Sequence, residues 1–464
     1  MDKKYQRSLF IFRRDLRLQD NTGLILALNN SDKVICSFIF TPDQIEHNQY
    51  KSERCLQFMI ESLEELQEDI KAKKGKLYLF FGSPETVVLD CIKKLKIEAV
   101  FVNFDYTPYS IKRDERIESV CKKHMVDFYS TEDALLHSVE KTVKKDNSPY
   151  SIFTPFYRNA SKSDVLPPIV NRHSNYYSES ISFSKSDSLY KKILPKRFKQ
   201  TKGGRSAALK ILKNLKEFSK YSKERDFPYL DKTTHLSAHL KFTTCSVREV
   251  YHAILKQLGK SSELLRSLYW RDFFTSVAYH YPHVFEGAFH HKFNKLKWNN
   301  NKQAFKRWCE GNTGFPIVDA GMRQMNQTGF MHNRVRMIVA SFLVKDLHID
   351  WRLGEKYFAR SLIDYDPAVN NGNWQWSAST GCDAQPYFRI FNPWAQAIKV
   401  DPKCLYIKKW VPEIASLSHN EIHRWGEDLH DKNINYPFPM VDHAKEAKTT
   451  LFEYKKVALS KKTT

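Results

Sequence analysis

Short apolar runs alternate with helical periodicity along the first third of the chain. Four runs have the length and composition of buried strands, at residues 8–12, 34–40, 76–81 and 99–103. Helical patterns occur at residues 56–70, 84–95 and 111–124. Because strands that alternate with helices form parallel sheets covered by those helices, residues 1–130 are predicted to be a Rossmann-like α/β domain.

The pattern changes twice after residue 130. Residues 131–202 are polar and rich in proline and serine, which predicts an interdomain linker that lies on the surface. Helical periodicity then dominates, with patterns at 207–218, 247–258, 262–279, 303–309 and 321–347. We therefore expect an all-α C-terminal domain over residues 203–464.

Composition narrows the class of protein. The 464 residues are 42% hydrophobic and 14% aromatic, which is enough for more than one packed core. Eight cysteines are scattered without a Cys-x-x-Cys pair, so neither a disulfide framework nor a metal site is expected. No run approaches the ~18 apolar residues of a membrane span, so we expect a soluble intracellular protein with no membrane partner. The 74 Lys and Arg against 52 Asp and Glu, a net charge of +22, suggest a polyanionic partner, with a lysine-biased composition as the alternative.

A basic turn at residues 12–21 follows the first predicted strand and contains Arg13, Arg14 and Arg17. At the carboxyl edge of a parallel sheet such a turn is placed to bind a ligand. A cluster of ion pairs between domains is the alternative. Neither a Gly-x-Gly-x-x-Gly motif nor a P-loop follows this strand, which disfavours a dinucleotide dehydrogenase or an NTPase.

Two helix starts in the second half carry candidate binding residues. Hydroxyl groups precede a helical turn in the run Thr233, Thr234, His235, Leu236 and Ser237. Free N–H groups at a helix start bind phosphate, although the same residue types also serve as plain N-caps. Further along, Asn333 and Met337 lie four residues apart and therefore share a helical face, unless Met337 simply packs in the core.

The most informative segment is residues 364–391. It holds two carboxylates, an amide pair and two tryptophans that flank a glutamine: Asp364, Asp366, Asn370, Asn371, Trp374, Gln375 and Trp376. This array is too polar and too aromatic for an ordinary loop, and it resembles the flavin-embracing loop of the photolyase/cryptochrome family. The resemblance extends from residue 12 to about residue 412 and includes the basic turn, the hydroxyl run and the helix of Asn333.

The resemblance implies that the helical domain binds FAD. The contacts it implies are Tyr221, Thr233, Thr234, His235, Leu236, Ser237, Arg271, Asn333, Arg336, Asp364, Asp366 and Asn370. Arg336 is expected to pair with Asp364, and Asn370 to face the flavin N5, while His235 stands where the family more often has arginine. In the family the basic turn opens a domain that binds an antenna chromophore. Folate, deazaflavin and FMN all stay open here, as does loss of the pocket, because the usual folate-holding residues are not recognisable.

The resemblance also assigns electron transfer and DNA contacts. Trp298, Trp351 and Trp374 match the family's electron-transfer chain, with plain core packing as the alternative for each. The implied DNA contacts are Arg225, Ser267, Trp270, Asn333, Arg334, Met337 and Trp376. Trp270 and Trp376 match the aromatic walls that a flipped pyrimidine dimer needs. Ser267 departs from the family, since dimer photolyases usually carry a glutamate there.

Taken together, the resemblance implies a class I cyclobutane pyrimidine dimer photolyase that acts as a monomer on UV-damaged DNA. Reduced FAD would absorb blue light and donate an electron to the flipped dimer, which then splits into monomers. Asn333 and Met337 stand where (6-4) photolyases place two histidines, and only a short Lys-rich tail follows the helical part, which favours the enzyme branch. A cryptochrome-like blue-light sensor is the first alternative, and a (6-4) photolyase is the second.

Overall fold

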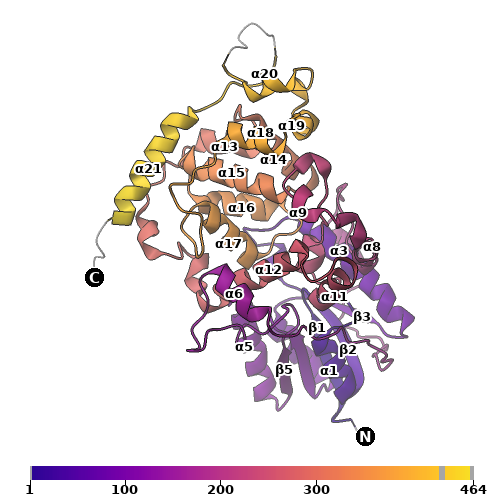
Figure 1. Cartoon of the computed structure of the whole chain (residues 1–464). Coiled ribbons are helices and arrows are strands. Elements are labelled where there is room, and N and C mark those ends of the chain that lie inside the picture. Colours follow the sequence, from indigo (N-terminus) through magenta and orange to yellow (C-terminus); the bar gives the residue numbers. More distant parts are fainter. Residues whose placement is uncertain (1–2, 428–433, 460–464) are drawn as a thin grey trace. The chain divides into compact units, whose positions relative to one another are not determined.

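The computed structural model describes residues 3–427 and 434–459 (Figure 1). Packing divides the chain into two units. The first unit comprises Met1–Tyr150, Thr154–Ser219 and Thr234–Tyr279. The second comprises Ser151–Phe153, Lys220–Thr233 and His280–Thr464. The domain boundaries predicted at residues 130 and 202 come from changes in the pattern of the sequence, whereas these two units are defined by how the residues pack. The predicted boundaries therefore stay a prediction.

The first unit contains a parallel sheet of five strands in the order β3-β2-β1-β4-β5. The strands are β1 Tyr5–Phe12, β2 Ser31–Phe40, β3 Leu77–Phe81, β4 Ala99–Asn103 and β5 Asp127–Thr131. The four predicted strands and the parallel sheet are confirmed. The edge strand β5 was not predicted, because its residues are only partly buried and form no continuous apolar run.

Helices α1 Thr22–Asn30, α3 Glu53–Ala72, α4 Pro84–Leu95 and α5 Pro108–Lys123 connect these strands. The three predicted helical patterns correspond to α3, α4 and α5. Helix α1 was missed because most of its nine residues are buried, so it shows little alternation of apolar and polar positions. Apolar residues of β1, β2 and β4, among them Leu9, Ile35 and Val100, form a core together with α4 and α5.

Nearly all of the segment 131–202 belongs to the first unit. It contains α6 Phe153–Ala160 and α7 Ser188–Ile193, and Tyr176, Tyr177 and Tyr190 are buried. The backbone N–H of Val34 donates to the Asn175 oxygen at 3.0 Å, and that of Tyr177 donates to the Val34 oxygen at 2.9 Å. These bonds extend the sheet at the start of β2.

The first unit also contains α2 Pro42–Ile45, α8 Arg205–Lys213, α10 Ser237–Lys241, α11 Val247–Leu258 and, except for His280, α12 Glu263–His280. The second unit is helical and contains α9 Tyr221–Glu224, α13 Lys302–Glu310, α14 Pro316–Thr328, α15 Asn333–Lys345, α16 Trp351–Ser361, α17 Pro367–Ser377, α18 Pro393–Val400, α19 Leu405–Trp410, α20 His419–His423 and α21 His443–Leu459. Helices α15, α16 and α17 pack in succession (Figure 1). Their shared core is large and includes Trp308, Phe342 and Trp374.

The single helix predicted over residues 321–347 is wrong, because the structure has two helices there. Helix α14 ends at Gly329, whose φ of +71° suits glycine and closes the helix in the left-handed conformation. The His332 side chain then accepts a hydrogen bond from the Arg334 backbone N–H and caps α15. This break makes Asn333 the first residue of α15.

Within the described ranges every helix is too short or too polar to span a lipid bilayer. The same residues contain no group of three or more His, Cys, Asp or Glu side chains that could hold a metal ion.

Candidate active site

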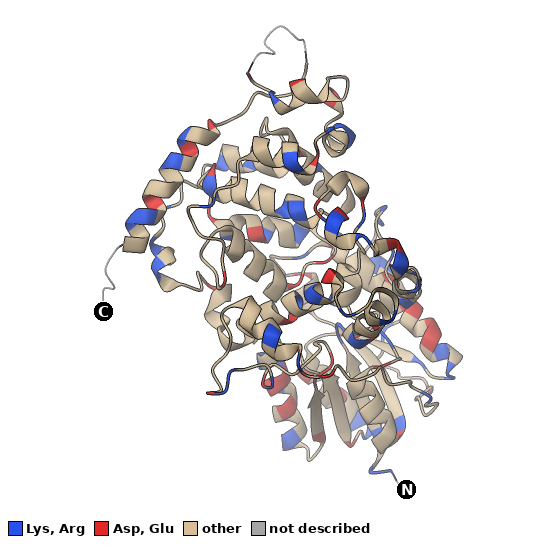
Figure 2. Ribbon diagram, viewed as in Figure 1, with Lys and Arg blue, Asp and Glu red and all other residues tan. Residues whose placement is uncertain are grey.

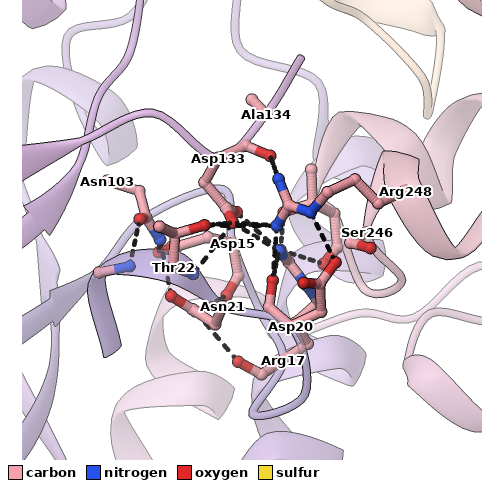
Figure 3. A network of polar contacts seen from close by, with 12 residues as sticks. Asp15, Arg17, Asp20, Asn21, Thr22, Asn103, Asp133, Ala134, Ser246 and Arg248 are labelled. Carbon is pink, nitrogen blue, oxygen red and sulfur yellow. Dashed lines mark hydrogen bonds and ion pairs between the residues drawn. The ribbon is translucent and has the colours of Figure 1, made fainter. Parts of the chain in front are cut away.

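The basic turn after β1 is held by ion pairs inside the first unit. Figure 3 shows Arg17 and Arg248 converging on the carboxylates of Asp133 and Asp20. Arg17 lies 2.7 Å from Asp133, and Arg248 lies 3.0 Å from Asp133 and 2.9 Å from Asp20. Arg17 and Asp133 are fully buried, a state that charged groups tolerate only when they are paired. Ion pairs therefore account for the burial of Arg17, and they lie within the first unit instead of between domains.

The two other arginines of the turn are also paired. Arg13 contacts Asp114 at 2.7 Å, and Arg14 contacts Asp105 at 3.4 Å. These arginines thus connect the turn to the segments that follow β4, while Arg13 Nη2 is buried without a hydrogen-bond partner among the described residues.

The predicted pair of Arg336 and Asp364 is present in the second unit. The Arg336 guanidinium donates to Asp364 Oδ2 at 2.9 Å, and the Asp364 side chain is only 4% exposed. Asp364 Oδ1 is also buried, and it has no hydrogen-bond partner among the described residues. Burying a carboxylate oxygen without a hydrogen-bond partner is energetically unfavourable, so Asp364 Oδ1 is suited to accept a hydrogen bond from a bound ligand.

Residues 367–377, expected to form a loop, are helix α17 instead. Asp366 accepts hydrogen bonds from the backbone N–H groups of Ala368 and Val369, and Pro367 occupies the first helical position. These are strong helix-start signals, whereas Asp366 was predicted only as a flavin contact. Asp366 is therefore the N-cap residue of α17.

Asn370 is held by a carboxyl group that the sequence analysis missed. Its Nδ2 donates to Glu355 Oε1 at 2.8 Å and to the Glu355 backbone oxygen at 3.2 Å. Glu355 lies on α16, is 6% exposed, and its pKa is raised to about 7 by burial. No motif singled out this glutamate, because α16 itself was not predicted.

The start of α15 presents two predicted contacts on one face. Asn333 is exposed and Met337 is half-buried, and their side chains meet, with Asn333 Nδ2 at 4.0 Å from Met337 Sδ. The prediction that they share a face is confirmed, and Met337 is not among the buried core residues. Between them, Arg334 donates to Asp226 at 2.7 Å, a partner that the sequence analysis did not foresee.

The three predicted electron-transfer tryptophans belong to one core. Trp351 and Trp374 are 4% and 2% exposed, and the partly buried Trp298 packs against the same cluster. Trp374 contacts Phe358 with ring centroids 4.9 Å apart. A Cβ on Gly354 of α16 would come within 2.2 Å of the Trp374 ring, so glycine permits this close approach. Trp308, which the sequence analysis left unassigned, meets Trp374 edge-on at 6.2 Å.

Trp376 is half-buried near the end of α17, and its neighbour Gln375 anchors the helix. Gln375 accepts from the Phe289 backbone N–H at 2.8 Å and donates to the oxygens of Val284 and Gly287. These hydrogen bonds of Gln375 fix the backbone of α17 next to Trp376.

Trp270 and Ser267 lie on α12 of the first unit. The Trp270 ring lies 5.5 Å from the Phe274 ring. The Ser267 hydroxyl donates to the Glu263 backbone oxygen one turn earlier at 3.1 Å. On the same helix Arg271 donates to the Ala134 oxygen at 2.7 Å.

The hydroxyl run does not cap a helix with its side chains. Helix α10 begins at Ser237, and the preceding Leu236 has no side-chain cap, so the plain N-cap alternative is wrong. Thr234 accepts from the Leu236 backbone N–H at 3.4 Å, and His235 has a left-handed φ of +54°. Thr233 Oγ1 is buried and lacks a hydrogen-bond partner within the described part of the chain.

Two further predicted contacts lie on the segment that leads to this run. The Arg225 guanidinium lies 5.9 Å from the Tyr221 ring centroid, within cation–π range.

Basic residues are spread over most helices of both units, and on α21 they alternate with acidic ones (Figure 2).

Comparison with known proteins agrees with this geometry. Residues 264–456 match the family described as the FAD binding domain of DNA photolyase, and residues 8–171 match the DNA photolyase family. The deoxyribodipyrimidine photo-lyase of Alkalihalophilus pseudofirmus is 35% identical and aligns over 96% of this chain and 97% of its own length.

Two solved structures share the fold over nearly the whole chain. The archaeal photolyase from Sulfolobus tokodaii with two FAD molecules has a TM-score of 0.88 and 42% identity, covering 97% of this chain and 100% of that one. The bacterial class III photolyase from Agrobacterium tumefaciens has a TM-score of 0.91 and 33% identity, covering 99% of each chain. The chain therefore belongs to the photolyase/cryptochrome family.

Proposed function

We propose that this protein is a light-dependent DNA repair enzyme, a deoxyribodipyrimidine photo-lyase that splits cyclobutane pyrimidine dimers. The observation that carries the proposal is the start of α15, where Asn333 and Met337 share one accessible face while Arg336 holds Asp364. The names of the relatives support the same reaction class. The assignment to class I rests on residue choices alone and stays part of the proposal.

The residues present fit FAD. Asp364 Oδ1 and Thr233 Oγ1 are buried polar atoms without a partner among the described residues, and the first can accept a hydrogen bond from the flavin ring while the second can donate to phosphate. The hydrogen bond from Arg336 holds the Asp364 carboxylate in position. When bound, FAD supplies the light absorption and the electron that the reaction needs.

Further FAD contacts are proposed from the family resemblance. They are Tyr221, Thr234, His235, Leu236, Ser237, Arg271, Asn333, Asp366 and Asn370. The Glu355 contacts orient the Asn370 amide, and the helix-capping bonds fix Asp366.

Substrate choice follows from the chemistry of the α15 face. An amide and a thioether are neutral and cannot act as general acids near neutral pH. Opening of a cyclobutane ring by electron transfer needs no proton donor from these positions, whereas paired histidines would offer one. We therefore assign dimers, and not (6-4) products, as the substrate.

Aromatic and basic groups are proposed to bind the lesion. Trp376 and Trp270 supply flat apolar surfaces for the extruded bases. Arg225 and Arg334 are proposed DNA contacts, with Arg334 held by Asp226 until phosphate competes for it. Trp298, Trp351 and Trp374 are proposed to reduce the flavin by stepwise electron transfer, supported by their common core.

The proposal also covers the antenna chromophore, the oligomeric state of the protein and its location in the cell. Folate, deazaflavin, FMN and, from the description of the Sulfolobus tokodaii relative, a second FAD are the candidate antennas. We propose that the protein acts as a monomer, in the intracellular compartment that holds DNA.

The proposal is tested by illuminating the purified, reduced protein with an oligonucleotide that carries one cyclobutane dimer. Blue light should restore the monomers with multiple turnovers, and a matched dark sample should restore none. Lesion binding without light-dependent restoration would contradict the repair function and favour a photosensor.

A further inference from the structure

A lysine is buried in the second unit at the far end of the helix that carries Asn333. Lys345 is the last residue of α15 and is 1% exposed. Lysine is almost never fully buried unless it is paired, since its ammonium is strongly hydrated. The position therefore calls for a specific role.

The Lys345 ammonium binds one short segment. Its Nζ donates to Ser379 Oγ at 2.8 Å and to the Arg389 backbone oxygen at 3.3 Å, and it lies 5.9 Å from the Tyr454 ring centroid. Among the described residues Lys345 forms no ion pair with a carboxylate within 4.0 Å. Burial lowers the pKa of Lys345 to about 8, which the neighbouring Asp346 only partly offsets.

Ser379, the first of these two contacts, lies in the turn that ends α17, just after Trp376. Ser379 has a φ of +58°, a left-handed conformation that a residue with a side chain keeps only when its surroundings hold it. The Tyr454 hydroxyl of α21 donates to the Ala378 oxygen at 2.7 Å, and the Thr450 hydroxyl donates to the Lys345 oxygen at 2.6 Å. The turn is thus fixed by α15 and α21 together.

This turn closes back onto the backbone of Trp376. The Trp376 oxygen accepts from the backbone N–H groups of Ser379 and Gln385, both at 3.3 Å. Beyond Gln385 the segment exposes Phe388, which is 64% accessible, and the Arg389 side chain. Exposed aromatic and guanidinium groups are the kinds of side chain that stack on bases and pair with phosphate.

We propose that Lys345 is a positioning residue for lesion binding: its ammonium holds the Ser379 turn and the Arg389 backbone, and so aligns Trp376 and the Phe388–Arg389 surface with damaged DNA. The inference rests on the proposed function and deepens it. Lys345 itself touches neither DNA nor the reacting atoms.

A purely structural role predicts a different result. Replacing a buried charge with an apolar side chain of similar volume is often neutral for stability, so Lys345→Met removes the hydrogen bonds while keeping the packing. A packing role would leave lesion affinity near that of wild type. If Lys345 is a positioning residue, the Lys345→Met protein should lose affinity for the lesion while it keeps its fold.

The experiment measures Kd for a duplex with one cyclobutane dimer and for the same undamaged duplex, using FAD-loaded wild type, Lys345→Met, Ser379→Ala and the double variant. Lys399→Met is the matched control, since Lys399 is an exposed lysine near the end of α18 and the change in charge is the same. Lys345→Met should raise Kd for the lesion roughly tenfold, the effect of losing hydrogen bonds to a charged group. FAD content, Kd for undamaged DNA and repair yield per photon at saturating lesion should match those of Lys399→Met.

Ser379→Ala should weaken lesion binding in the same direction, and the double variant should be no worse than Lys345→Met alone because both act through one contact. Unchanged lesion affinity in Lys345→Met, or equal losses on damaged and undamaged DNA, would overturn the inference. If Lys345→Met does not fold, unchanged lesion affinity in Ser379→Ala would overturn it. A wild-type protein without lesion preference would instead overturn the proposed function, and this inference with it.

Discussion

The Nδ2 atom of Asn370 lies 2.8 Å from a carboxyl oxygen of Glu355 and 3.2 Å from the Glu355 backbone oxygen. Both N–H groups of the amide are therefore committed to one residue of the neighbouring helix, and the amide oxygen is left to accept. A reduced flavin carries an N–H at N5, so this orientation suits Asn370 to the cofactor that we propose.

Glu355 should make stability depend on pH. Its pKa is raised from 4.5 to about 7 by burial, so the folded state holds a proton that the unfolded state releases between these values. The free energy of unfolding should thus fall as pH rises from 4.5 to 7, by at most about 3 kcal/mol from this group. Glu355→Gln should remove that dependence, measured as urea midpoints at pH 5 and pH 8 with equal FAD loading. The exposed Glu310→Gln is the control, and an unchanged slope in Glu355→Gln would show that Glu355 titrates normally.

Trp374→Phe should slow light-driven reduction of oxidised FAD and leave dimer repair by chemically reduced enzyme nearly intact. Phenylalanine is much harder to oxidise than tryptophan, yet it keeps an aromatic ring beside Phe358. The measurements are the absorbance of oxidised flavin under blue light and the repair yield after reduction with dithionite. Trp425→Phe, another buried tryptophan of the second unit, is the control. Loss of both activities in Trp374→Phe would mean that Trp374 acts through packing.

Trp376→Ala should weaken binding of the lesion by ~1–3 kcal/mol, the usual contribution of stacking one base on an aromatic ring. Binding to undamaged DNA should change little and should weaken with salt, because it depends on phosphate contacts. Titrations with damaged and undamaged duplexes test this, with Trp410→Ala as a matched change of a half-buried tryptophan. Equal losses on the two duplexes would point to a disturbed α17.

Ser267→Glu should keep or modestly raise the repair yield per photon, and Ser267→Ala should have a small effect. The Ser267 hydroxyl already donates to the Glu263 oxygen of its own helix, and α12 is continuous from Glu263, so Glu263 shares the face. A hydrogen bond that water can replace is worth ~0.5–1.5 kcal/mol. The three proteins are compared at equal content of reduced FAD, and a collapse of repair in Ser267→Ala would assign the serine a direct role.

Periodicity predicted both fold classes and four of the five strands, because buried strands and amphipathic helices leave local signatures, but it identified no helix after α15. It failed where burial is uniform, as in α1, or partial, as in β5. It also joined α14 to α15, because apolar positions continue across the break that Gly329 and His332 create.

The candidate site was predictable where motif residues meet one another, as in the pair of Arg336 and Asp364. It was not predictable where the partner comes from an unremarkable stretch of sequence. Glu355, Asp226 and Lys345 carry no local signal, and only the packing of α16, the segment 220–233 and the end of α15 brings them to the site.

The most direct test of the account is side-by-side repair of two lesions by the reduced protein under blue light. One oligonucleotide carries a cyclobutane thymine dimer and the other carries a (6-4) product at the same position, and restored thymines are quantified by chromatography against dark controls. Because Asn333 and Met337 offer an amide and a thioether instead of two imidazoles, we predict restoration of the dimer and none of the (6-4) product. Restoration of the (6-4) product without the dimer would contradict the account.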